Sequence, residues 1–473
     1  MKGKRLNSSI AQKSGQLQSI LRNRLARRRY VLLALPLALL FVTGCATAAA
    51  QGLVPAAPQL PAGVQVTFSA PATTISYDDR DPARERFELP LLYLHRQREA
   101  TAPAERTLLI SLTGIAAGSE VVVEATSQHE NVATGRRHSE RMHFLSDRDC
   151  TGYAPCSVQM VLDPNTMPSD LYFLRVTDAA GQVRWEMSNR PAFAALDTWD
   201  VGVSGAIVRV YYAQLFPFAR GEADRPNRLP PDAVPDFIEK QMAPIVQETW
   251  RTQVEEWGFG PLHPDWDADH IVEVIITDPP FALFDGTGTY TLFHGDDGRF
   301  YSTRRIWWFA CNNSFAAYDT LEDAYKATFP HEFFHLMQWN VLLQTGQPYN
   351  YWQGWLEGQG VVAPTIQYPE LRHNTYAIVA DRVRAQGLGP SWAGQESDPG
   401  NCYDSAPFWR FIYEQYGGPQ IFRAALEEMV RTAGQDTDNV AAAMKRALDA
   451  AFARVEGRFG SFEEGFLAYA SAE

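Results

Sequence analysis

The chain has 473 residues, of which 45% are hydrophobic and 12% aromatic, so it can bury a sizeable core. This composition excludes a disordered tail, a collagen-like fibre and a small disulfide scaffold, and the length predicts two or three folded units. Nine of the 42 Lys and Arg lie in residues 1–44, which hold no Asp or Glu, so the remainder carries 33 basic against 55 acidic residues, a net charge of −22. Such an acidic body argues against binding of nucleic acid through the phosphate backbone.

Residues 1–45 have the pattern of an export signal. Arginines precede an apolar stretch over residues 31–42, and V-T-G-C follows, ending at Cys45. This order is typical of a secretory signal, and the stretch is shorter than the roughly 20 residues that span a bilayer. V-T-G-C also resembles the bacterial lipobox, whose cysteine is acylated and becomes the first mature residue. We therefore expect an extracytoplasmic protein, held at the membrane through lipidated Cys45; secretion after cleavage at A-T-A and an uncleaved anchor are the alternatives.

Residues 46–62 are rich in Ala, Pro and Gly and predict a flexible tether. Residues 63–190 then contain short apolar or β-branched runs separated by turn residues. These runs cover residues 108–112, 121–125, 158–162, 171–176 and 183–185. The pattern predicts an all-β sandwich, of the immunoglobulin-like type, in which no chemistry is visible.

The cysteines agree with export to an oxidising compartment. Without Cys45 four remain, and four cysteines allow three disulfide connectivities. Cys150 and Cys156 flank a short loop, so local pairing is the economical choice and would leave Cys311 to pair with Cys402. The alternative is that all four are small buried side chains. None has the C-x-x-C spacing of a thiolate metal site.

After residue 190 the character of the sequence changes. Strands are predicted at residues 207–212, 271–277 and 306–310, and a helix at 235–257, interrupted at Pro244. From residue 320 onward helices dominate, predicted at 320–340, 351–362, 375–384, 406–416, 420–432, 440–455 and 462–470. Strands followed by a run of helices predict an α+β domain over residues 191–473.

The segment A-T-F-P-H-E-F-F-H-L-M-Q-W carries the chemistry. His331 and His335 are four residues apart, so on a helix both face the same side and can bind one Zn²⁺. Glu332 lies between them, where it can act as a general base. Pro330 means that the helix either begins at this point or is kinked there. A catalytic zinc site needs a third protein ligand, and Glu357, 22 residues after His335 in W-L-E-G, is the best candidate.

H-E-F-F-H followed by W-L-E-G resembles the gluzincin superfamily of zinc peptidases, whose third ligand is a glutamate in this context. C-Y-D-S-A-P-F-W-R-F-I-Y-E-Q-Y-G-G resembles the segment that supplies a tyrosine in aminopeptidase-N-like and hyicolysin-like members. The resemblance implies a zincin-like catalytic domain with a helical C-terminal subdomain. It also implies hydrolysis of peptide bonds, with Tyr403 as the donor to the oxyanion and His373 as the second choice. The tryptophans at 307 and 308 would line the cleft for an extended peptide.

The sequence departs from the resemblance in two places. No G-x-M-E-N segment is present, which favours an endopeptidase over an aminopeptidase. Val361 stands four residues after Glu357, where thermolysin-like enzymes have an aspartate, so the group that orients His331 or His335 is not identified. The competing hypothesis is a surface-binding lipoprotein whose zincin-derived domain has lost its activity. Asp296-Asp297-Gly298 lacks the ligand pattern of an EF-hand and predicts a plain turn rather than a calcium site.

Overall fold

A computed structural model describes most of the chain from residue 63 onward. The described residues are 63–69, 73–77, 87–95, 102–131, 134–163, 166–187, 191–213, 234–260, 271–276, 292–294, 300–302, 305–308, 318, 320–342, 353–371, 374–386, 403–416, 418–432 and 440–472. The expected signal and tether, Cys45, the expected Cys311–Cys402 pair and His373 lie outside these ranges, as do residues 296–298.

A small antiparallel sheet forms one layer of the β region. Its strand order is β1 (Gln65–Ser69), β4 (Thr107–Thr113) and β7 (Cys156–Val161). Burial alternates along β4 and β7, so Leu108, Ile110 and Val158 are buried while their neighbours are more exposed. The predicted strands at 108–112 and 158–162 are thereby confirmed to within a few residues.

The larger sheet has ten strands among the described residues. Its main path runs β15-β12-β11-β10-β8-β5-β6, and β2, β3 and β9 pair alongside it. The strands are β2 (Thr73–Tyr77), β3 (Phe87–His95), β5 (Glu120–Asn131), β6 (Arg136–Leu145), β8 (Asp170–Asp178), β9 (Val183–Glu186), β10 (Phe193–Val203), β11 (Ala206–Tyr212), β12 (Ile271–Ile276) and β15 (Arg305–Trp308). A separate hairpin pairs β13 (Leu292–His294) with β14 (Phe300–Ser302).

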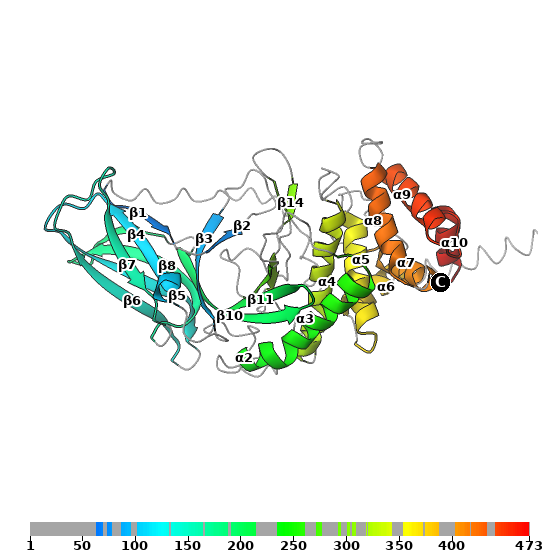
Figure 1. The fold of residues 1–473 in the computed structure, drawn as a ribbon, viewed down its shortest axis with the longest axis horizontal. Helices are drawn as coiled ribbons and strands as arrows, with labels where there is room; N and C mark the ends of the chain where they lie inside the picture. Colours follow the sequence, from blue (N-terminus) through cyan, green and yellow to red (C-terminus); the bar gives the residue numbers. More distant parts are fainter. Residues whose placement is uncertain are drawn as a thin grey trace, which may run out of the picture. The chain divides into compact units, whose positions relative to one another are not determined.

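Strand β10 links the β region to the rest of the chain, and the sequence analysis did not predict it. Its first residues pair with β8 and its later residues with β11, while β3 pairs with it in parallel. Strands β11, β12 and β15 then continue the sheet in parallel. Hydrogen bonding therefore runs without a break from strands before residue 190 to strands after it (Figure 1).

Two hydrophobic cores lie on opposite faces of the sheet at β3, β8 and β10. Consecutive side chains of a strand point to opposite faces, and here they enter different cores. Leu91, Leu171 and Ala194 belong to the core shared with the helices. Their neighbours Leu92, Tyr172 and Phe193 belong to the core between the two sheets of the β region.

The first helical segment changes type along its length. It begins with α2 (Val234–Phe237), continues through π-helical turns at Ile238–Met242 and Arg251–Glu256, and has α3 (Ala243–Trp250) between them. The change from π to α geometry comes directly before Pro244, which has no N–H to donate. The predicted helix at 235–257 is confirmed, and it continues through Pro244 rather than ending there.

The remaining helices fall where the sequence predicts them. They are α4 (Leu321–Leu342), α5 (Gln353–Gln367), α6 (Asn374–Gln386), α7 (Ala406–Tyr416), α8 (Gln420–Thr432), α9 (Val440–Arg454) and α10 (Phe462–Ala472). Helix α4 contacts α5 and α8, and α5 contacts α6 and α7 (Figure 1). The fold is therefore mixed, with sheets in the N-terminal part and helices in the C-terminal part. None of the described helices is both long enough and apolar enough to cross a membrane.

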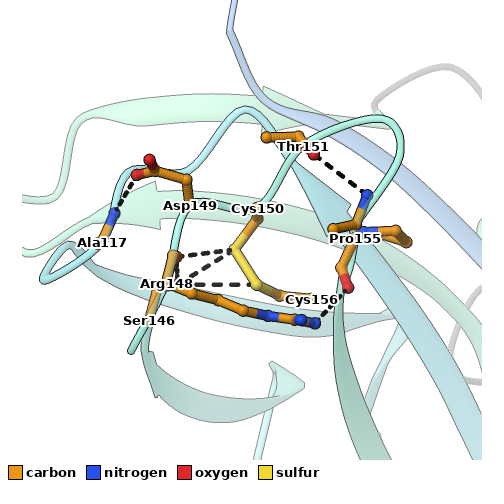
Figure 2. Close-up of a disulfide and its surroundings, with 9 residues drawn as sticks. Ala117, Ser146, Arg148, Asp149, Cys150, Thr151, Pro155 and Cys156 are labelled. Carbon is orange, nitrogen blue, oxygen red and sulfur yellow. Dashed lines mark hydrogen bonds between the residues drawn. A yellow bond between two sulfur atoms is a disulfide. The ribbon is translucent and has the colours of Figure 1, made fainter.

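A disulfide joins Cys150 to Cys156, as the short loop between them predicts (Figure 2). Their Cα atoms are 5.2 Å apart and both residues are buried. The hydroxyl of Ser146 lies 3.1 Å from the Cys150 sulfur, and Asp149 accepts a 2.8 Å hydrogen bond from the Ala117 N–H. The crosslink thus closes the loop before β7, and the hydrogen bond of Asp149 ties this loop to the turn that precedes β5.

Candidate metal centre

Helix α4 brings His331, Glu332 and His335 together near its middle. The two imidazole rings are 4.7 Å apart between centroids and nearly perpendicular, as the i, i+4 spacing on one helix face allows. Pro330 lies inside α4, which excludes the alternative that the helix begins at this proline and agrees with the helix predicted over residues 320–340. The Pro330 carbonyl accepts a 2.8 Å hydrogen bond from the Gln253 side chain, which joins the π-helical segment to α4 just before His331.

Glu357 comes from α5 and completes a triangle of possible ligand atoms. Its Oε2 lies 3.5 Å from Nε2 of His331 and 3.3 Å from Nε2 of His335, and the two Nε2 atoms are 3.0 Å apart. Ligand atoms about 2.0–2.1 Å from a metal ion in tetrahedral geometry are about 3.3 Å from one another. The three atoms therefore already have the spacing that a single ion requires.

Glu332 is a second carboxylate in the same place. The possible ligand atoms of His331, Glu332 and His335 all lie within 4.8 Å of one another, so this group could itself hold a metal ion. Glu357 is likewise close, at no more than 3.5 Å from either imidazole nitrogen. Two buried carboxylates therefore lie near the pair of imidazoles, one from each helix.

The charges of the site are coupled because they are buried together. Burial alone would lower the pKa of His335, but the adjacent Glu357 carboxylate outweighs it and raises that pKa to about 9. Burial would likewise raise the pKa of Glu357, but His335 holds it well below its ordinary range. Without a metal the site is thus a buried ion pair, in which a proton occupies a nitrogen that a metal ion would need.

Two glycines allow α5 to approach its neighbours closely. A Cβ at Gly360 would lie 3.0 Å from Cε1 of His335 and 3.1 Å from Cε1 of His331. A Cβ at Gly358 would overlap the Ser405 hydroxyl, at 1.9 Å, next to the start of α7. The glycines that follow Glu357 therefore permit contact with the imidazole rings on one side and with α7 on the other.

Tyr403 lies beside the first histidine. Its ring is 6.2 Å from the His331 ring between centroids, and the residue is partly buried. The residues after it are anchored: Asp404 accepts a 2.9 Å hydrogen bond from Arg382 of α6, and the Ser405 hydroxyl donates to the Gly354 carbonyl of α5. These contacts hold Tyr403 at the edge of the triangle.

The structure also shows a group that the sequence analysis did not identify. Nδ1 of His335 lies 2.8 Å from Oε1 of Gln338, a buried amide on the same helix. Its i+3 spacing from His335 was a usable signal, because it places both residues on one helix face. Trp307 and Trp308 lie in β15, which ends the path of the larger sheet.

No protein-family model matches this chain, and no curated protein matches it. The assignment of function therefore rests on the site itself.

Proposed function

We propose that this chain is an exported zinc-dependent peptidase of the gluzincin type, acting as an endopeptidase on peptide or protein substrates. The convergence of the His331, His335 and Glu357 ligand atoms, 3.0–3.5 Å apart, carries this proposal. Two imidazoles and one carboxylate are the ligand set of many catalytic zinc sites, in which a fourth position stays open for water. The absence of a G-x-M-E-N segment supports an endopeptidase over an aminopeptidase.

When bound, zinc would supply a Lewis acid that activates water and polarises the scissile carbonyl. Glu332 is proposed to accept the proton of the attacking water and then to pass it to the leaving amine. Its position within 4.8 Å of the ligand atoms of both histidines supports this role. Tyr403, next to His331, is proposed to donate a hydrogen bond to the negative charge that develops on the substrate oxygen.

The same proposal includes a zincin-like fold for residues 191–473 and an immunoglobulin-like sandwich for 63–190. In support of the second, the Tyr172 hydroxyl donates to the Pro168 carbonyl four residues upstream. This resembles the tyrosine corner of immunoglobulin-like sandwiches. The alternative, a surface-binding protein without activity, would have the same fold but would not hydrolyse peptide bonds. Measurements of peptidase activity therefore separate the two hypotheses.

The deciding experiment replaces the proposed base. Glu332→Gln keeps the size of the side chain but cannot accept a proton, so kcat on a denatured protein substrate should fall by about 10²–10⁴. Zinc content, measured by elemental analysis, should stay at one equivalent because Glu332 is not among the three proposed ligands. Glu322→Gln, the same change on the half-exposed first turn of α4, is the matched control and should leave kcat unchanged. Equal hydrolysis by Glu332→Gln and the parent protein would overturn the peptidase assignment.

Tyr403→Phe tests the oxyanion role separately. It removes one hydroxyl and keeps the ring, so zinc content should be unchanged while kcat falls by roughly 10²–10³. If Tyr403→Phe is silent and Glu332→Gln is not, the base assignment stands and another group, such as His373, donates to the oxyanion.

Export through lipidation is proposed from residues 1–45. Intact mass spectrometry of the membrane fraction should find a mature chain that begins at acylated Cys45. A soluble mature chain beginning near residue 49 would support plain secretion instead.

A further inference from the structure

One buried amide touches both helices that carry the proposed zinc ligands. Gln338 on α4 is completely buried. Its Oε1 lies 2.8 Å from Nδ1 of His335, one turn back on the same helix. Its Nε2 donates 3.0 Å hydrogen bonds to the Leu356 carbonyl and to the Gln359 side chain, both on α5. Leu356 directly precedes Glu357, so the amide lies between a ligand of α4 and the backbone beside the ligand of α5.

The contact with Leu356 determines which end of the amide faces His335. A backbone carbonyl can only accept, so the amide nitrogen of Gln338 must point toward α5 and its oxygen toward the imidazole. An oxygen at that position accepts a hydrogen bond, which places the proton of His335 on Nδ1. The lone pair of Nε2 is then left on the side of His331 and Glu357, where a metal ion would use it.

We propose that Gln338 is a positioning residue for the metal centre: it fixes the tautomer and ring orientation of His335 and holds the α4 ligands in register with Glu357. The inference rests on the proposed zinc site and assigns a role that neither the H-E-x-x-H motif nor the third ligand explains. An apolar side chain of the same size could fill this space without the cost of burying an amide. The three hydrogen bonds of Gln338 offset that cost and point to orientation rather than packing.

Zinc affinity, measured by competition with a chromophoric chelator, tests the proposal without requiring activity. Gln338→Met keeps the volume and loses the acceptor, so Kd for Zn²⁺ should rise by about 10–100-fold. Gln338→Glu keeps an oxygen facing His335 but loses the donor to Leu356, so it should weaken zinc binding less than Gln338→Met does. Gln367→Met is the matched control, because the amide of Gln367 at the end of α5 bonds to Thr249 and Tyr368 rather than to Gln338, and it should have little effect on Kd.

Each result has a separate meaning. If the parent protein binds no zinc, the proposed function itself fails. If the parent binds zinc and folded Gln338→Met binds it equally well, only the role of Gln338 is overturned. The role of Gln338 is also overturned if the Met and Glu variants both fold and bind zinc with the same reduced affinity. Should Gln338→Met fail to fold, nitrogen-15 NMR of the zinc-loaded parent remains decisive. A slowly exchanging proton on Nδ1 of His335 is expected, and rapid exchange of that proton with solvent would overturn the proposal.

Discussion

At the scale of single residues, the geometry of the site depends on Gly360, which has no side chain. Gly360 lies three residues after Glu357, on the face of α5 that meets both histidines. Contacts of 3.0–3.3 Å from a hypothetical Cβ to the two rings are tighter than ordinary van der Waals contact, so the rings would have to move by a few tenths of an ångström. Ligand geometry of this kind tolerates little displacement.

We therefore expect Gly360→Ala to separate stability from metal binding. Alanine is favoured over glycine in a helix interior by roughly 0.5–1 kcal/mol, so the metal-free protein should unfold at the same temperature or slightly higher. The displaced imidazoles should weaken zinc binding by about tenfold or more. Thermal unfolding without metal and chelator competition measure the two effects, and Gly202→Ala, where a Cβ meets nothing within 4 Å, should change neither affinity nor fold.

At the scale of elements, a buried carboxylate connects three neighbouring strands of the larger sheet. Glu124 of β5 accepts hydrogen bonds from Ser139 and Arg141 of β6, at 2.7 and 2.8 Å, and from Arg175 of β8, at 3.1 Å. Burial by itself raises its pKa, but these hydrogen bonds outweigh burial and lower the pKa to about 2. The charged form is thus favoured by the fold.

This cross-strand group should make stability depend on pH in the acid range. Because the pKa of Glu124 is lower in the folded state, its contribution is present above about pH 4.5 and is lost as pH falls toward 2. Glu124→Gln should lower the free energy of unfolding at pH 7 by about 1–3 kcal/mol, allowing for solvent around the exposed arginines. Denaturant titrations at pH 7 and pH 3 measure this.

The mutant difference should shrink at pH 3. Glu140→Gln on β6 is the control, since Glu140 is half exposed and its substitution should have almost no effect. An equal loss at both pH values would show that the charge of Glu124 is not what stabilises the strands.

At the scale of the whole molecule, the candidate metal site lies beside one large apolar core. The helices α4 and α5, which carry the proposed ligands, share one large apolar cluster with α3, α7, α8 and α9 and with strands β10, β11 and β12. Most of the stability therefore comes from apolar burial. Metal binding would add to it by mass action.

We expect chelation to lower the stability of the protein without unfolding it. Free zinc at 100 times Kd should raise the free energy of unfolding by about 2.7 kcal/mol over the metal-free form. Circular dichroism and thermal unfolding, with and without a chelator, check this. His335→Ala should show a much smaller zinc-dependent shift, and complete unfolding of the parent protein on chelation would contradict the argument.

The sequence alone predicted several of the strands and the C-terminal helices, and it made Cys150–Cys156 the economical choice of disulfide. It also singled out His331, Glu332, His335 and Glu357, which the structure places together. Local spacing is sufficient for these features, because the period of a helix or strand decides which neighbours share a face. The residue types that bind a metal are few, so they can be recognised in a sequence when they occur at that spacing.

The tertiary structure alone decided the features that depend on distant partners. Strand β10 escaped prediction because both of its faces are covered by cores over Phe193–Thr198, so its sequence has no alternation of polarity. The continuity of the sheet depends on which strands pair, and pairing is a long-range choice. Gln338 looks like any polar residue on a helix until α5 lies against it, since only the contacts with His335 and Leu356 give its amide a direction.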